Sequence, residues 1–181
     1  VLTISREGQE PFDVTLTRAV IQIQSVRSRV EKNIGYIRIT SFNEQTQPGL
    51  KRAIAKITEE LGDEVAGYII DLRNNPGGLL SQAVKVSDSF LERGEIVSTR
   101  GRQEGEASRF NAESGDMVSG LPLVVLITEG SESYSKKVAG ALQDHRRALV
   151  GGTRSFGKGA VQTIMPIPGA GAMRLTTARY Y

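Results

Sequence analysis

The stretch TEGSESYSKKVAGALQDHRRALVGGTRSFGKGAVQT, residues 128–163, carries the densest structural signals in the chain. Its pattern predicts the end of a strand, a Gly-Ser turn, a helix over 133–143, a short strand at 149–150 and a lysine between glycines. A serine at the start of a helix lies beside free backbone N–H groups, where negative charge is favoured. The glycines around Lys158 let the backbone bend sharply and aim its side chain. Together these features indicate a hydrolase that uses a serine and a lysine.

Strand and helix patterns alternate on both sides of this stretch. Such alternation is typical of parallel βαβ units and predicts an α/β domain. The expected elements are strands at 35–40, 67–72, 95–100, 108–111 and 122–128, helices at 47–61 and 79–91, and a final hairpin of 161–167 with 172–181. Residues 1–5 and 12–17 have the pattern of another hairpin, and residues 19–30 alternate like a linking strand.

Composition excludes several functional classes. With 181 residues, 39% apolar and 24% charged, the chain is expected to form one soluble globular domain, or one domain plus a fragment. The net charge is only +3 and aromatic residues are few, which argues against a nucleic-acid partner. The absence of cysteine excludes thiolate chemistry, and the single histidine, His145, argues against a Ser-His-Asp triad or a histidine metal site. We interpret Asp71, Arg73 and Asp144 as structural residues.

Three loops follow expected strands at their carboxyl ends, where α/β folds usually place their sites. They are RNNPGG at 73–78, EGSES at 129–133 and RSFGKG at 154–159. The paired glycines of the first loop allow the main chain to approach a ligand and to offer N–H groups. The alternative interpretation of that loop is a tight strand-to-helix turn.

The second loop supplies three candidate nucleophiles at alternate positions, Ser131, Ser133 and Ser135. A serine near a helix start is more often an N-cap than a nucleophile. A base elsewhere in the chain changes this balance, and lysine serves as a base when burial lowers its pKa. Lys158 is the candidate, and its alternative interpretation is an ordinary exposed loop lysine.

Two segments resemble the carboxyl-terminal processing, or tail-specific, serine protease family. They are PLVVLITEGSESYSKKVAGALQDHRRALVGGTRSFGKGAVQT with the following hairpin, at 122–181, and YIIDLRNNPGGLLSQAVKVSDSFL at 68–91. The resemblance implies an α/β core of mixed βαβ units, related to the crotonase-like spiral, over residues 35–181. It implies that residues 1–20 are the last strands of a β-rich PDZ domain and that residues 21–34 are a linker strand.

The resemblance also implies the catalytic residues. The family has a lysine 25 residues after its nucleophilic serine and a glutamine four residues after that lysine, a spacing that selects Ser133, Lys158 and Gln162. Lys158 would act as the general base, and Gln162 would orient its amine. The backbone N–H groups of Tyr134 and Gly78 would form the oxyanion hole, with Gly77 as the alternative second donor.

This chain departs from the family around the serine, where it has GSESYSKK at 130–137 in place of the usual GSASASEI. The ring of Tyr134 is expected to narrow the pocket for the substrate side chain. Lys136 and Lys137 would disfavour another nearby ammonium if they faced the site, and would not affect catalysis if they faced solvent. We expect them to face solvent.

The implied function is a serine endopeptidase that cleaves proteins near their C-termini through an acyl-enzyme, with the substrate bound as a strand added to a sheet. No cofactor, metal or nucleic acid is expected, and the family implies the bacterial periplasm or cell envelope. Homo-oligomerisation and membrane association are left open. The alternatives are a catalytically silent peptide-binding or scaffold member of the family, and a hydrolase of a non-peptide amide.

Overall fold

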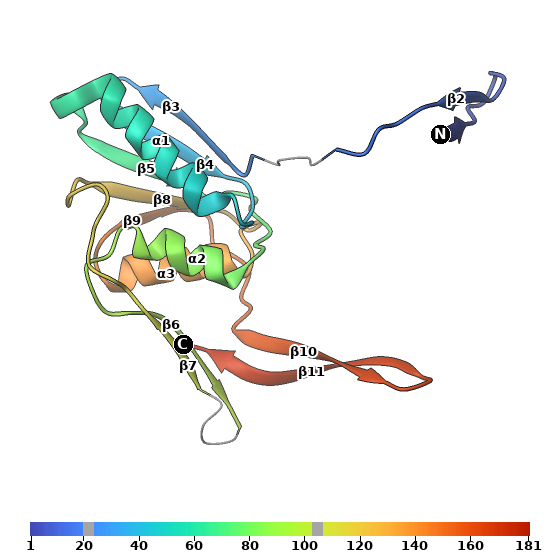
Figure 1. Cartoon of the computed structure of the whole chain (residues 1–181). Coiled ribbons are helices and arrows are strands. Elements are labelled where there is room, and N and C mark those ends of the chain that lie inside the picture. The colour runs from blue at the N-terminus through green and yellow to red at the C-terminus, as the bar shows by residue number, and fades with distance from the viewer. Residues whose placement is uncertain (20–23, 103–106) are drawn as a thin grey trace.

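A five-stranded sheet forms the centre of the computed structural model, which describes residues 1–19, 24–102 and 107–181 (Figure 1). Its strand order is β3–β4–β5–β8–β9, with β3 antiparallel to β4 and the other neighbours parallel. The strands are β3 (Val26–Glu31), β4 (Ile34–Ile39), β5 (Gly67–Asp71), β8 (Leu123–Ile127) and β9 (Leu149–Gly152). The parallel βαβ units expected from the sequence are therefore present.

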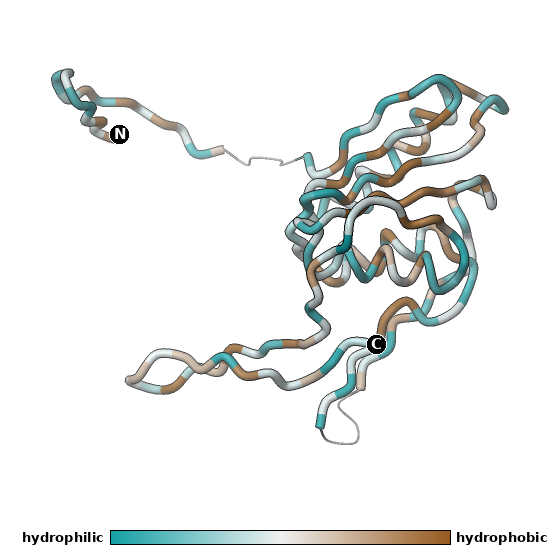
Figure 2. The backbone as a smooth tube through the Cα atoms, turned by 180° about the vertical axis from the view of Figure 1, so that it is seen from behind, coloured by the Kyte–Doolittle hydropathy of each residue, from teal (hydrophilic) through white to brown (hydrophobic). Residues whose placement is uncertain are grey.

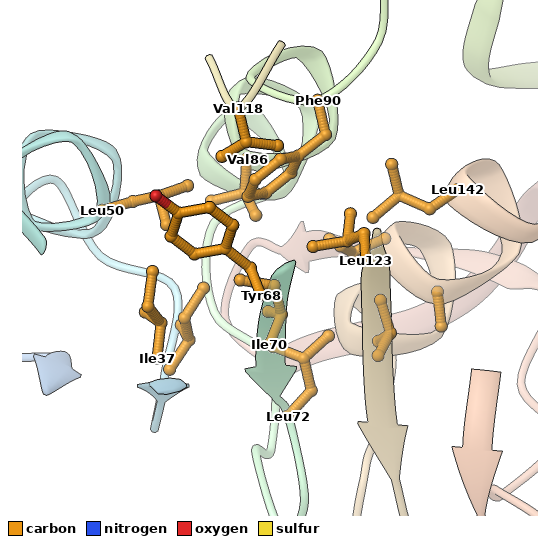
Figure 3. Packing of buried hydrophobic residues seen from close by; sticks show 14 of the residues in the cluster. Ile37, Leu50, Tyr68, Ile70, Leu72, Val86, Phe90, Val118, Leu123 and Leu142 are labelled. Carbon is orange, nitrogen blue, oxygen red and sulfur yellow. The ribbon is translucent and has the colours of Figure 1, made fainter. Parts of the chain in front are cut away.

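Three helices connect the parallel strands: α1 (Thr46–Leu61, followed by the 3₁₀ turn Gly62–Glu64), α2 (Leu80–Asp88) and α3 (Tyr134–Asp144). The successive crossovers all step across the sheet in the same direction, so right-handed connections place the helices on one face. Their apolar sides pack on the strands, and Figure 3 shows Ile70, Leu123 and Leu142 contributing to the same core from β5, β8 and α3. Apolar residues concentrate along the central strands in Figure 2.

A second sheet is antiparallel and has the order β10–β11–β6–β7. Its strands are β6 (Glu95–Gly101), β7 (Ser108–Asn111), β10 (Ala160–Ile167) and β11 (Gly171–Tyr180). The β10–β11 hairpin extends away from the central sheet in Figure 1 and exposes several large apolar side chains. This hairpin carries the Gln162 position, so it connects the second sheet to the candidate site.

The first part of the chain contains a small hairpin of β1 (Leu2–Ile4) and β2 (Phe12–Val14), as its alternation predicted. The segment expected to be a linking strand over 19–30 differs from the prediction. Residues 26–31 form β3, the edge strand of the central sheet, while residues 20–23 of that segment lie outside the described residues. Within the described residues, no helix is long and apolar enough to cross a membrane.

Candidate active site

The glycine loop after β5 is fixed by a short parallel contact with Phe42. Phe42 N–H donates to the Gly77 carbonyl over 2.8 Å, and Leu79 N–H donates to the Phe42 carbonyl over 2.8 Å. In a parallel pairing of this kind, the N–H of the residue between the two bonded positions points away from the partner strand. The N–H of Gly78 is therefore directed away from Phe42.

Asn75, which sequence analysis assigned no role, joins this loop to the turn before α3. Its side chain is buried, donates to the Ile39 carbonyl over 2.9 Å and accepts from Gly77 N–H over 2.8 Å. Its carbonyl accepts from Glu132 N–H over 2.9 Å and from Ser135 Oγ over 3.2 Å. The Asn-Pro sequence signals a turn, but nothing in it indicates a contact with residues almost sixty positions later.

The three candidate serines have different environments. Ser131 and Ser135 are both fully buried, and their hydroxyls donate to the carbonyls of Leu72 (2.8 Å) and Asn75 (3.2 Å). The hydroxyl of Ser133 makes no hydrogen bond with any described residue, and Ser133 is one of the residues that line a cavity. Ser131 and Ser135 therefore support the turn, and Ser133 is the serine available for chemistry.

Ser133 has a strained backbone at the N-cap of α3, with φ 43° and ψ −101°. A non-glycine residue in such a region costs on the order of 1–3 kcal/mol, and such residues cluster at functional sites. The glycine loop packs directly against Ser133: a Cβ added to Gly77 would be only 3.3 Å from Ser133 Cβ. This backbone conformation places the Ser133 side chain between the glycine loop and the N-terminus of α3.

A cavity of about 320 Å³ brings the predicted catalytic side chains together. Lys158 is exposed, and its Nζ donates to Gln162 Oε1 over 3.4 Å. No hydrogen bond joins Ser133 Oγ to Lys158 Nζ in the described part of the chain, and Lys158 is not buried, although the predicted role of general base would require burial. The cavity is lined by Ser133, Tyr134, Lys158, Ala160, Val161, Gln162, Ile164, Arg174 and Tyr180.

The backbone donors expected near Ser133 differ in availability. Gly77 N–H is committed to Asn75 Oδ1. The N–H groups of Gly78 and Tyr134 have no acceptor among the described residues. The N–H groups of Gly78 and Tyr134, the predicted oxyanion-hole donors, are therefore free to bind an anion. The N–H of Gly77, the alternative second donor, is already hydrogen-bonded.

The expectation that Lys136 and Lys137 face solvent is wrong. Both are partly buried. Lys136 Nζ donates to the Lys158 carbonyl over 3.4 Å, and Lys137 Nζ lies 3.6 Å from the centre of the Tyr180 ring, a cation–π distance. Lys136 thus approaches the loop that carries Lys158, and Lys137 approaches the Tyr180 side of the cavity.

Burial and mutual repulsion set the protonation of these lysines. Burial, followed by the charges of Lys136 and Lys158, lowers the pKa of Lys137 to about 8. Burial also lowers the pKa of Lys136, where Glu132 opposes the shift and Lys158 adds to it. The ammonium groups are therefore close enough to destabilise one another.

Tyr134 and Tyr180 form one wall of the cavity. Their rings meet edge to face with centroids 6.3 Å apart, and their hydroxyls lie 3.4 Å from each other. Burial, with the hydrogen bond to Tyr134 adding to it, raises the pKa of the Tyr180 hydroxyl. The Tyr134 ring therefore borders the same cavity as Ser133.

The sequence model of peptidase family S41 matches residues 33–181. This chain belongs to peptidase family S41. The carboxy-terminal-processing protease of Bartonella bacilliformis is 53% identical over 182 residues, covering 99% of this chain and 42% of that protein. The carboxyl-terminal-processing protease of a Synechocystis species is 36% identical over 185 residues, with 99% and 42% covered. The S41 chain thus spans less than half the length of these relatives.

Solved structures agree with the S41 fold. A photosystem II D1 C-terminal processing protease superposes with a TM-score of 0.76 at 31% identity, covering 94% of this chain and 47% of that one. A putative S41 protease from Bacteroides fragilis superposes with a TM-score of 0.68 at 16% identity, which shows the shared fold alone. The α/β architecture predicted from the sequence is therefore that of S41 peptidases.

Asp71, the last residue of β5, stabilises the central sheet next to the glycine loop, in agreement with its structural interpretation. It is fully buried and accepts from Tyr36 Oη, from Arg38 Nη1 over 3.1 Å and from Arg73 Nη2 over 2.8 Å. Although burial opposes ionisation, hydrogen bonds from Arg73 and Tyr36 lower the pKa of Asp71 to about 2. Asp71 is therefore a buried carboxylate that orders the end of β5.

The far end of α3 lies far from Ser133. His145 caps this helix, with Nε2 2.8 Å from the Glu95 carbonyl, about 18 Å along the helix from Ser133. A Ser-His pairing is thereby excluded in this arrangement. Asp144 is exposed and forms neither a side-chain hydrogen bond nor an ion pair with the described residues, so its interpretation as a structural partner is wrong.

Proposed function

We propose that the protein is a serine endopeptidase in which Ser133 is the nucleophile and Lys158 the general base. The observation that carries this proposal is the environment of the three serines. Ser131 and Ser135 are buried and bonded to main-chain carbonyls, whereas Ser133 lines the same cavity as Lys158 and Gln162. The family resemblance and the S41 membership support the same choice.

In the proposed first step, neutral Lys158 takes the proton from Ser133 Oγ while Oγ attacks the carbonyl carbon of the scissile amide. The carbonyl oxygen becomes an oxyanion, which the N–H groups of Gly78 and Tyr134 would stabilise. Lys158 then returns the proton to the leaving amine as the amide C–N bond breaks, and an acyl-enzyme remains on Ser133. In the second step Lys158 takes a proton from a water, which attacks the ester carbonyl carbon. The bond from that carbon to Ser133 Oγ then breaks, Lys158 returns the proton to Oγ, and the new C-terminus is released.

Gln162 would hold the amine of Lys158 in position during both transfers. The 3.4 Å hydrogen bond between Lys158 Nζ and Gln162 Oε1 supports this role. Lysine acts as a base only when neutral, and exclusion of water favours the neutral form. A bound substrate would cover the exposed Lys158, so we expect the dyad to close when substrate binds.

The free edge of β10 is the proposed docking site for an extended substrate. β10 pairs only with β11 among the described residues, and it contributes four residues to the lining of the cavity. A peptide added to this edge would gain main-chain hydrogen bonds and run past the Ser133 hydroxyl. By analogy with the relatives, we propose cleavage near substrate C-termini, in the bacterial periplasm or cell envelope.

The test is cleavage of an unfolded protein by the longest natural form of the protein, compared with its Ser133→Ala and Lys158→Ala variants. We expect both substitutions to reduce the rate by at least 10³-fold, as removal of a member of such a catalytic set does. Equal rates in all three proteins would overturn the assignment. A wild-type protein that binds the unfolded substrate without cleaving it would favour the silent, peptide-binding alternative.

A further inference from the structure

Positive charge is concentrated in the part of the chain that builds the cavity. Residues 131–181 contain eight Lys or Arg and two Asp or Glu, a net charge of +6, whereas the whole chain carries +3. Lys158 and Arg174 line the cavity, and none of the described residues that line it is a carboxylate. Lys136 and Lys137 lie at its border, where Glu132 is the acidic neighbour that acts on Lys136. The cavity is therefore suited to an anion.

Arg174 is the cation best placed to bind one. It stands on β11 directly opposite Ile164, is exposed, and forms no ion pair with any described residue. Ile164 follows Gln162 by two residues on β10, which is about 7 Å along a strand. Arg174 is thus displaced by one strand repeat from Gln162 along the hairpin, on the side farther from Lys158 in the sequence.

We infer that Arg174 is a specificity-determining residue that binds a carboxylate of the substrate close to the scissile bond. This inference rests on the proposed function and adds a substrate class to it. The guanidinium is permanently charged and can bind both oxygens of a carboxylate. The carboxylate belongs either to an acidic side chain or to the free C-terminus of the substrate.

The separation between Arg174 and the base matters chemically. A carboxylate beside a lysine favours the charged form of that lysine, which cannot accept a proton. A carboxylate held by Arg174, opposite Ile164, which is six residues past Lys158 in the sequence, would neutralise part of the positive charge of the cavity with less effect on Lys158. The lysines at the border then contribute long-range attraction, which salt weakens.

The experiment compares matched peptides in the longest natural form of the protein. One series moves a single glutamate through the positions around the cleavage site, with glutamine in the same positions as reference. A second series compares a free C-terminal carboxylate with its amide. Both series are measured for kcat/KM in the wild type and in Arg174→Gln, with Arg179→Gln as control, because Arg179 is on the same strand and does not line the cavity.

We expect the wild type to prefer one carboxylate-bearing peptide by about tenfold, the lower end for a hydrogen-bonded charge pair. Arg174→Gln should lose that preference, and Arg179→Gln should keep it. The glutamate series and the amide series identify which carboxylate is bound. Equal kcat/KM for acidic and neutral peptides, or a preference that survives in Arg174→Gln, would overturn the inference.

Binding to Ser133→Ala, measured by fluorescence anisotropy with the same peptides, separates this inference from the proposed function. An Arg174-dependent preference in binding, without cleavage by the wild type, would contradict the endopeptidase proposal and retain the carboxylate site. Cleavage by the wild type without any preference for carboxylate-bearing peptides would support the endopeptidase proposal and contradict the carboxylate site. Absence of binding to every peptide would also overturn the carboxylate site.

Discussion

The carbonyl oxygen of Phe42 lies 2.1 Å from the point that a Cβ at Gly78 would occupy. Gly78 also has φ +142°, a conformation that L side chains rarely adopt. The same two residues form the parallel contact that directs Gly78 N–H away from Phe42. The glycine is therefore required both for the loop to pack and for its N–H to be available.

Gly78→Ala should consequently lower both stability and activity. We expect a loss of about 3 kcal/mol in the free energy of unfolding, from overpacking against main chain and from backbone strain. Denaturant titration and the peptide cleavage assay measure the two effects. Gly140→Ala is the matched control, since nothing lies within 4 Å of its added Cβ and it is inside α3, where alanine is favoured. Unchanged stability in Gly78→Ala would contradict the packing argument.

The strained backbone of Ser133 predicts a trade-off between stability and activity. Ser133→Gly should be more stable than Ser133→Ala by about 1 kcal/mol, because glycine relieves the strain but has greater freedom in the unfolded chain. Both variants should be inactive. Thermal unfolding of the pair tests this expectation, and an alanine variant at least as stable as the glycine variant would show that φ 43° costs little here.

Asp71 should make the free energy of unfolding decrease at acidic pH. Its pKa is about 2 in the folded chain, against 3.8 for the unperturbed group, so its contribution is present above about pH 4 and disappears as pH falls toward 2. The difference corresponds to about 2 kcal/mol. Asp71→Asn should lose this amount at pH 7 and show a flatter stability curve between pH 4 and 2. Parallel curves for the two proteins in that range would contradict the assignment.

Lys137 should make stability depend on pH in the alkaline range, and here the charged form destabilises the folded chain. Its folded pKa of about 8 lies below the ordinary 10.5, so the charged form destabilises the folded chain below pH 8. Between about pH 8 and 10.5 only the unfolded chain keeps the proton, and stability therefore rises with pH. Lys137→Met should stabilise the protein at pH 7 by about 1 kcal/mol, a value reduced by partial exposure and by the lost Tyr180 contact. Denaturant titration at pH 7 and pH 10 measures the stability advantage of Lys137→Met over the wild type, which should shrink at pH 10. An advantage that stays constant or grows would exclude the charge of Lys137 as its cause.

Much of the fold follows from local patterns in the sequence. The 3.6-residue period of α1 and the apolar runs of β5 and β8 predicted their types and approximate bounds, because each buries one face or both faces in the same core. The edge strand β3 was harder to assign. Its side chains alternate, and alternation alone does not distinguish an edge strand from a linker between domains.

The candidate active site was harder to predict from local sequence patterns. The choice of Ser133 came from a spacing known in a family, while the hydrogen bonds that occupy Ser131 and Ser135 depend on the fold. Lys137 follows Ser133 by four residues, so helical geometry could have placed them on one face. Its contact with Tyr180 depends on β11, which lies more than forty residues later.

Covalent labelling of the nucleophile tests the central claim most directly. A fluorophosphonate that reacts with activated serines is added to the longest natural form of the protein, and peptide mapping by mass spectrometry locates the adduct. We predict one adduct per chain, on Ser133, lost in Ser133→Ala and formed far more slowly in Lys158→Ala. An adduct on Ser131 or Ser135, or a labelling rate unchanged by Lys158→Ala, would contradict the assignment of Ser133 and Lys158.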